Sequence, residues 1–150
     1  MIPSWTTTST TLNIVVDTNQ FLSVFVFRGM MMQLVFDLVL EKKINMYISL
    51  ALKNELLEKF QFFKVSDQVQ DKVMSFIEQR GILIEPVVKV DVCRDKKDNF
   101  VLELAESSKA DYIITRDKDL LELPNKRWKN TKIVKPEEFL SYLRRNKLLK

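Results

Sequence analysis

A chain of 150 residues has the length of one domain with one hydrophobic core. Its composition, 46% hydrophobic and 29% charged, is that of a soluble globular protein, and no apolar run approaches the roughly 18 residues of a membrane span. The chain has one cysteine, Cys93, and no histidine. These counts exclude an internal disulfide, a histidine-based triad and a histidine metal site, and they favour a reducing, cytoplasmic setting. Any metal here would be bound mainly by oxygen.

The net charge of +4 is distributed unevenly. Residues 126–150 carry nine basic and two acidic side chains, a net charge of +7, and the other 125 residues together carry −3. A basic end on a slightly acidic body suggests attraction to a polyanion such as nucleic acid. A solvated helix face explains the same charges and, on charge alone, is the simpler interpretation.

The first half of the chain predicts two strands and two helices after a polar start. Residues 1–12 are threonine-rich, and we expect a flexible leader there, followed by a single domain over 13–150. Strands are predicted at 13–16, where Ile14, Val15 and Val16 suit burial on both faces, and at 44–49. The helix predicted over 30–43 has Leu34, Val35, Leu38 and Val39 on one face, and the helix over 50–61 has Leu52, Leu56 and Phe60 at helical spacing.

The second half continues the alternation. Ser66 is a plausible N-cap for a helix that ends near Gly81, and residues 82–88 hold a short strand with Pro86 at a bend. The remaining predicted elements are a helix at 97–108, a strand at 111–115, a helical turn near Leu120, a strand at 131–134 and a final helix at 136–147 that begins with Pro136. This order predicts an α/β domain, a three-layer α/β/α sandwich with a mostly parallel sheet.

Several carboxylates follow predicted strands. In open parallel sheets, ligands bind outside the carboxyl ends of the strands. Asp17 follows the first strand, Asp117 and Asp119 follow the strand at 111–115, Asp98 lies in the first turn of a helix, and Glu55 lies on the helix after the second strand. Four converging carboxylates would repel one another, and a divalent cation resolves that repulsion. Without histidine, Mg²⁺ or Mn²⁺ is the natural candidate.

Each of these acids also has a purely structural explanation. An aspartate at a strand end is about as often a cap or turn residue as a ligand. Asp98 would favour its helix dipole, Glu55 would suit the surface, and Asp117 or Asp119 would cap a short turn. The combination, in this order along the chain, favours the functional interpretation.

Four stretches together carry a resemblance to a known family. They are VVDTN (15–19), SLALKNELLEKF (49–60), CRDKKDNFVLELAESSKADYIITRDKDLL (93–121) and IVKPEEFL (133–140). Across roughly 13–143 the chain resembles the PIN-domain ribonucleases and, more narrowly, the VapC-like toxins of toxin–antitoxin systems. The resemblance implies an Mg²⁺- or Mn²⁺-dependent endoribonuclease that hydrolyses RNA phosphodiesters with a metal-activated water.

The resemblance also implies roles for individual residues. The catalytic acids would be Asp17, Glu55 rather than Glu58, Asp98 and Asp117, with Asp17, Asp98 and Asp117 binding the metal. Asn19, Asp95, Thr115 and Asp119 would be auxiliary, and Arg116, Arg144 and Arg145 would hold the RNA backbone. The chain departs from the family pattern at Leu50 and Lys96, where proline is frequent, and at Arg116 and Asp117, where glycine or asparagine is frequent. No departure removes a carboxylate.

Partners are implied in the same way. Such toxins pair with a small antitoxin and often form homodimers. The apolar stretch 21–32 suits the core better, and a dimer or antitoxin surface is the alternative. Two other functions remain for the whole chain. One is a PIN-like module that binds RNA or protein without cutting. The other is a receiver-type phosphotransfer domain, whose order of acids and late lysine we do not find.

Overall fold

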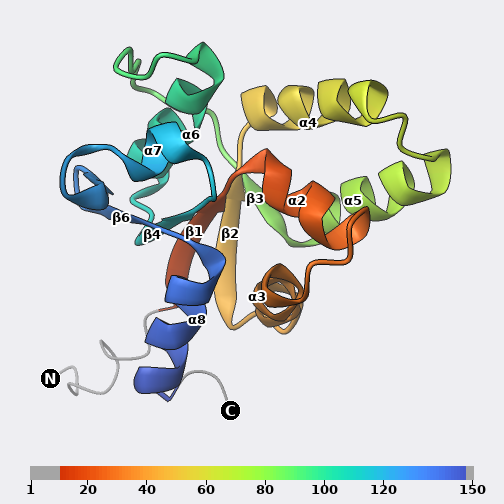
Figure 1. Ribbon diagram of the computed structural model, residues 1–150, viewed down its shortest axis with the longest axis horizontal. Helices are drawn as coiled ribbons and strands as arrows, with labels where there is room; N and C mark the ends of the chain where they lie inside the picture. The colour runs from red at the N-terminus through yellow and green to blue at the C-terminus, as the bar shows by residue number, and fades with distance from the viewer. Residues whose placement is uncertain (1–10, 148–150) are drawn as a thin grey trace, which may run out of the picture.

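The computed structural model describes residues 11–147, so most of the leader predicted over 1–12 lies outside the described residues. The centre of the molecule is a six-stranded sheet with the order β3-β2-β1-β4-β6-β5 (Figure 1). All neighbouring strands are parallel except β5 and β6. The strands are β1 (Leu12–Val16), β2 (Ile44–Ile48), β3 (Gly81–Leu83), β4 (Tyr112–Ile114), β5 (Arg127–Trp128) and β6 (Thr131–Val134).

Helices cover both faces of this sheet, which confirms the predicted α/β sandwich. α6 packs on β1, β2 and β4, whereas α3 and α5 pack on β2, and α3 also contacts α8. Parallel strands are generally joined by right-handed crossovers, so crossovers that progress in opposite directions along the sheet put their helices on opposite faces. The helices are α2 (Thr18–Phe25), α3 (Met30–Leu40), α4 (Leu50–Phe62), α5 (Asp67–Arg80), α6 (Lys96–Ser108), α7 (Lys118–Leu121), the 3₁₀ turn η1 (Pro124–Lys126) and α8 (Pro136–Arg145).

The strand order contains a switch point between β1 and β4. From β1 the chain moves outward through β2 to β3, and α6 then carries it back to β4 on the other side of β1. The connections therefore leave β1 and β4 in opposite directions at their carboxyl ends. In open α/β sheets this divergence opens a crevice in which ligands bind.

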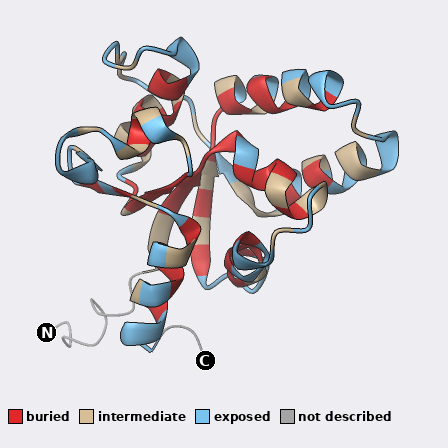
Figure 2. Cartoon of the chain, viewed as in Figure 1, coloured by how far each residue is buried: buried red, intermediate tan, exposed pale blue. Residues whose placement is uncertain are grey.

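The core lies between the sheet and its helices (Figure 2). Ile14 and Val15 have no exposed surface, as the aliphatic run predicted. Phe21 on α2 stacks on Phe36 of α3 at 5.0 Å, and Phe76 of α5 lies 5.0 Å from Phe36. These ring contacts hold α2 against α3 and α5. They therefore also hold Asp17, the residue just before α2, at the end of β1.

The apolar stretch 21–32 is divided between core and surface. Phe21, Leu22, Val24 and Met32 are buried, as expected of core, whereas Phe27, Met30 and Met31 are exposed. Part of this stretch forms α2, which was not predicted as a helix because it is only eight residues long. Within residues 11–147 no single helix is long and apolar enough to cross a membrane. Only α2 and α3 together reach that length and composition, and they are bent by 102°.

Three other predictions differ in detail from the structure. Leu34 is 39% exposed, because Met32, Val35, Phe36 and Val39 form the inner side of α3. The strand predicted over 82–88 is only β3, which ends at Leu83. η1 and the two-residue β5, which forms an antiparallel edge pair with β6, were not predicted.

Caps fix both helices that start near the predicted site. Ser49 accepts a hydrogen bond from the Leu52 amide at 3.3 Å and starts α4. Asp95 accepts one from the Lys97 amide at 3.0 Å and starts α6. An unpaired helix N-terminus carries several free amides, and a side-chain acceptor satisfies one of them. These caps set where α4 presents Glu55 and where α6 presents Asp98.

Candidate active site

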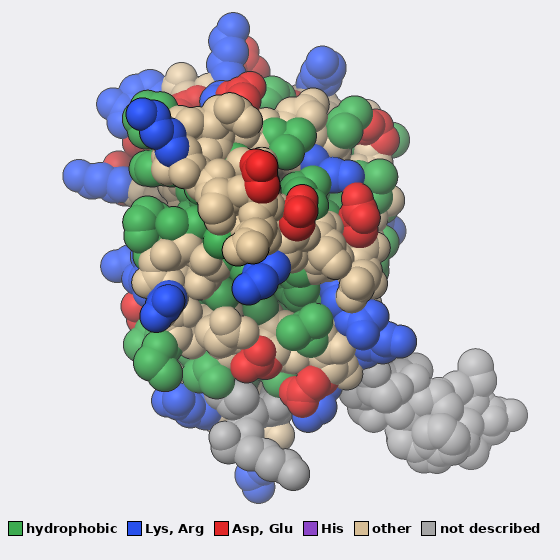
Figure 3. All heavy atoms as spheres, turned by 90° about the vertical axis from the view of Figure 1, so that its right-hand side faces the viewer, with side chains coloured by type: hydrophobic (Ala, Val, Ile, Leu, Met, Phe, Trp, Pro, Cys, Tyr) green, Lys and Arg blue, Asp and Glu red, His purple; other side chains and the backbone are tan. Residues whose placement is uncertain are grey.

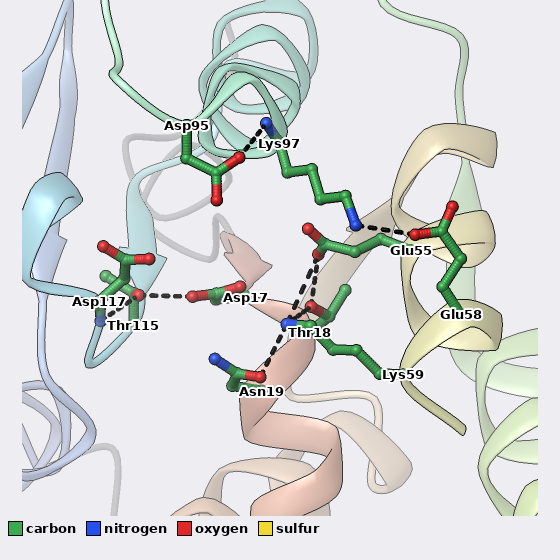
Figure 4. A network of polar contacts seen from close by, with 10 residues as sticks. All are labelled: Asp17, Thr18, Asn19, Glu55, Glu58, Lys59, Asp95, Lys97, Thr115 and Asp117. Carbon is green, nitrogen blue, oxygen red and sulfur yellow. Dashed lines mark hydrogen bonds and ion pairs between the residues drawn. The ribbon is translucent and has the colours of Figure 1, made fainter. Parts of the chain in front are cut away.

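Asp17 stands at the carboxyl end of β1 and is 5% exposed. It occupies the N-cap position of α2, but its side chain makes no capping hydrogen bond. Its Oδ2 instead accepts a hydrogen bond from the Thr115 hydroxyl at 2.8 Å (Figure 4). The structural explanation offered by the sequence, a helix cap, therefore does not hold for this side chain.

Thr115 links the two strand ends across the switch point. It is fully buried directly after β4, and its Oγ1 donates to Asp17 and accepts from the Asp117 amide at 2.9 Å. One hydroxyl thus fixes the carboxylate of Asp17 and the backbone that carries Asp117. The auxiliary role of Thr115 in catalysis stays a prediction.

Three carboxylates gather beside this link. One oxygen each of Asp98, Asp117 and Asp119 lie within 4.8 Å of one another. Asp98 is 7% exposed, and among the described residues its Oδ2 has no hydrogen-bond partner. A buried carboxylate oxygen without a donor is costly unless a cation meets it. This donor set suits a hard divalent cation such as Mg²⁺ or Mn²⁺.

The geometric cluster differs by one member from the predicted metal set. Asp119, predicted as auxiliary, takes part, and Asp17 is joined to the cluster through Thr115. Asp117 also accepts a hydrogen bond from the Asp119 amide at 2.7 Å and so caps α7. The same side chain therefore serves as a helix cap and as a member of the acidic cluster. Asp119 accepts from Arg94 at 2.7 Å. Asp95 is exposed and caps α6, away from direct contact with the trio.

Glu55 belongs to a second group on the other side of Asp17. It is 7% exposed and accepts a hydrogen bond from the hydroxyl of Thr18. The ammonium group of Lys59 lies 3.9 Å from Glu55 and donates to Thr18 and to Asn19, each at 2.7 Å (Figure 4). Glu58 is exposed and pairs with Lys97 at 2.7 Å. The choice of Glu55 over Glu58 thus agrees with the burial of the two side chains.

The pKa values of the acids reflect this crowding. Burial, followed by the negative charges of Asp117 and Asp17, raises the pKa of Asp98 from 3.8 to about 7. Burial also raises the pKa of Asp17, against the Thr115 hydrogen bond and the charge of Lys59. Burial raises the pKa of Glu55, against Thr18 and Lys59. Raised carboxyl pKa values in a cleft are a mark of functional sites.

Cys93 adds no ligand to this group. Burial, with the added negative charge of Asp98 and Asp117, raises the pKa of its thiol to about 11. A thiol with that pKa is protonated at neutral pH and is a poor metal ligand. The site therefore offers oxygen atoms, as the absence of histidine from the sequence suggested.

The three predicted RNA-binding arginines are not together. One guanidinium nitrogen of Arg116, Nη1, donates to both carboxylate oxygens of Glu137 on α8, at 2.9 and 3.1 Å. Arg144 and Arg145 lie in the last turn of α8, which runs from β6 back toward the amino ends of the strands (Figure 1). They are exposed at the end of the molecule opposite the acidic cluster. A contact of these two arginines with RNA stays a prediction.

Several residues of the site were not predicted. Thr18 and Lys59 hold Glu55, and Arg94 holds Asp119. Asn99, which is buried, accepts from the amides of Val92 and Cys93 and so fixes the segment before α6. The spacing of four between Glu55 and Lys59 was a visible signal, because such residues share a helix face. The pair of Arg94 and Asp119 has no local signal.

Comparisons with known proteins agree with this arrangement. A family model described as PIN domain matches residues 13–119, a range that includes all five acids of the two groups. The uncharacterized protein MJ1680 of Methanocaldococcus jannaschii is 31% identical over 140 residues, which cover 86% of this chain and 90% of that protein.

Two solved structures share the fold. One is VapBC2 from Rickettsia felis bound to a DNA fragment from their promoter, with a TM-score of 0.60 and 16% identity, over 81% of this chain and 97% of the matched chain. The other is the RRP44 PIN domain of T. brucei, with a TM-score of 0.53 and 12% identity, over 93% of this chain and 85% of the other. Since the family model spans well over half of the sequence, the chain belongs to the PIN domain family and has its nuclease-type fold.

Proposed function

We propose that this chain is a divalent-metal-dependent endoribonuclease. The observation that carries the proposal is the buried Asp98, which has an unpartnered Oδ2 and gathers with Asp117 and Asp119 at the switch point of the sheet. We propose these three residues, with Asp17 beside them, as the group that holds Mg²⁺ or Mn²⁺. A bound ion of this kind supplies an acidified water and positive charge for the oxygens of a phosphodiester in attack.

The chain's own residues prepare the site for this chemistry. Thr115 holds the Asp17 carboxylate toward the cleft and keeps it in one orientation. Arg94, paired with Asp119, offsets part of the negative charge that would repel a phosphate. Glu55, anchored by Thr18 and Lys59, is the residue that we propose to accept a proton from an attacking water.

RNA with an accessible, unpaired backbone is the substrate we propose. A site at the open edge of a sheet reaches a phosphate on a single strand or loop more readily than one in the narrow groove of an RNA helix. Arg116 lies next to Asp117 and presents a guanidinium beside the cleft, held by Glu137. The likeness of fold to the VapBC2 structure prompts us to include a small antitoxin partner in the proposal. Toxin function in the cytoplasm and a homodimer are further parts of the same proposal.

The test is cleavage of a mixed RNA pool by the wild type and by Asp98→Asn. We expect cleavage in Mn²⁺ or Mg²⁺ and none in chelator. The substitution keeps the shape but removes the charge that meets the ion, so the rate should fall on the order of 100-fold or more. Mn²⁺ binding, followed by the electron paramagnetic resonance of the free ion, should weaken in parallel. The matched control is Glu41→Gln, an exposed acid at the opposite edge of the sheet, which should change neither quantity.

Two outcomes would count against the proposal. Asp98→Asn cleaving at the wild-type rate would exclude the acidic cluster as the site. Wild-type protein that binds RNA but cuts none in any divalent ion would instead favour the alternative, a PIN-like binding module without catalysis.

A further inference from the structure

A pocket adjoins the acidic site on the side of α4. It has a volume of about 420 Å³ and is lined by Asn19, Glu58, Lys59, Phe62, Phe63 and Lys97. Asn19 comes from the start of α2 and Lys97 from the start of α6, and the other four residues come from α4 and its C-cap position, Phe63. Lys59 also contacts Thr18 and Glu55, so the pocket and the proposed catalytic site share a wall (Figure 4).

The aromatic side chains of this pocket are exposed. Phe62 is 79% exposed and Phe63 47% exposed, and their rings meet edge to face at 5.0 Å. Phe27, 64% exposed, meets Phe63 edge to face at 6.3 Å. The side of the molecule that carries the loop between α4 and α5 shows hydrophobic side chains among lysines and acids (Figure 3). Phe62 presents its ring to solvent and takes no part in the core cluster.

Charged groups accompany the rings. The ammonium group of Lys97 is fixed by Glu58 at 2.7 Å, and that of Lys59 by Asn19 and Thr18. Two ammonium groups beside an exposed aromatic ring suit a nucleotide. The ring can stack on the base, and the ammonium groups attract the phosphate. An apolar helix of a protein partner would have to bury both ammonium groups, which is costly.

From these observations we infer that the pocket takes one unpaired nucleobase of a single-stranded RNA, stacked on Phe62, with its phosphate toward Lys59 and Lys97. The inference rests on the proposed ribonuclease function, because it takes the base to be a neighbour of the phosphodiester held at the acidic cluster. It gives the chain a preference for unpaired RNA. The stacked base would also fix which phosphodiester lies at the acidic cluster, so the cleavage position would depend on an unpaired base rather than on a particular sequence.

The experiment compares wild type, Phe62→Leu and Phe62→Trp with the control Met30→Ala, another exposed apolar side chain outside this pocket. A fluorescein-labelled single-stranded oligoribonucleotide is titrated in chelator and its anisotropy recorded. It is compared with the same oligonucleotide carrying abasic sites and with a duplex of the same sequence. A parallel cleavage assay in Mn²⁺ gives kcat and KM.

Phe62→Leu keeps an apolar side chain but loses the stacking face, so it should bind the intact strand roughly 5-fold or more weakly. Phe62→Trp should bind at least as tightly as wild type, and Met30→Ala should match it. The abasic strand should bind wild type more weakly and should no longer distinguish wild type from Phe62→Leu. The duplex should bind all four proteins weakly.

Two results overturn the inference. One is equal affinity of wild type and Phe62→Leu for the intact strand. The other is a loss in Phe62→Leu that is just as large for the abasic strand, which would assign the pocket to a protein partner or to the fold. If wild type cleaves RNA while Phe62→Leu binds and cuts as well, the inference fails and the ribonuclease stands. If Phe62-dependent binding occurs without any cleavage, the ribonuclease fails and the base site stands.

Discussion

At the scale of single residues, Asp98 should make the stability of the protein depend on pH. Its pKa in the folded state is about 7, above the ordinary 3.8. Between these values the folded state keeps a proton that the unfolded state releases, so stability falls as pH rises through this window. The metal-free wild type should therefore lose free energy of unfolding from about pH 4 to about pH 7. Asp98→Asn should lose less of it.

Urea denaturation in chelator at several pH values measures this difference. The raised pKa values of Asp17 and Glu55 act in the same direction, so the variant should retain some slope. If the free energy of unfolding falls with pH equally steeply in the two proteins, the raised pKa of Asp98 does not contribute to the pH dependence of stability. Adding Mn²⁺ at pH 7 to wild type should restore stability, by roughly 2.7 kcal/mol at a hundred times the dissociation constant.

At the scale of elements, α6 ends in a strained residue. Lys109, its C-cap, has φ 56° and ψ 44°, the left-handed conformation that glycine adopts freely. The chain contains only two glycines, and in the described range eight residues other than glycine have positive φ. Seven of the eight are lysine or arginine, and the eighth is Asn125. At this position the sequence thus places a lysine where many helices end in glycine.

Lys109→Gly should therefore stabilise the fold. Relief of the left-handed conformation outweighs the lost interaction of the lysine with the helix dipole, for a net gain of about 0.5–1 kcal/mol. For a chain of this size that is a rise in melting temperature of roughly 2–4 °C, measured by circular dichroism. Lys109→Ala removes the same charge but keeps the strain, and it should melt no higher than wild type. RNA cleavage should not change, since Asp98 lies at the other end of α6.

At the scale of the whole molecule, the basic carboxyl-terminal part is separated from the acidic cluster. Replacing Arg144 and Arg145 with glutamine should weaken binding of a long RNA and reduce the salt dependence of its affinity, by a slope of about 0.7 for each lost phosphate contact. Cleavage of a short oligonucleotide should stay unchanged, because such a substrate does not extend from the cluster to the end of α8. Equal salt slopes for the variant and wild type would make these residues a solvated helix face.

The sheet and the position of the site were predictable because they depend on local patterns. Short aliphatic runs between amphipathic segments identify a parallel sheet, and acids after two of those runs identify its functional edge. α2 was missed because it is only eight residues long, so its two turns give little room for a helical period to show in the sequence. Arg94 and Asp119 lie 25 positions apart, and nothing in their local sequence predicts that they meet.

The hydrogen bond between Asp17 and Thr115 joins residues 98 positions apart in the chain. The two halves of the site therefore do not exist together on a nascent polypeptide until β4 and the residues after it have been synthesised. Under the proposed ribonuclease function, a nascent chain should therefore gain RNA-cleaving activity only after β4 has left the ribosome and paired with β1.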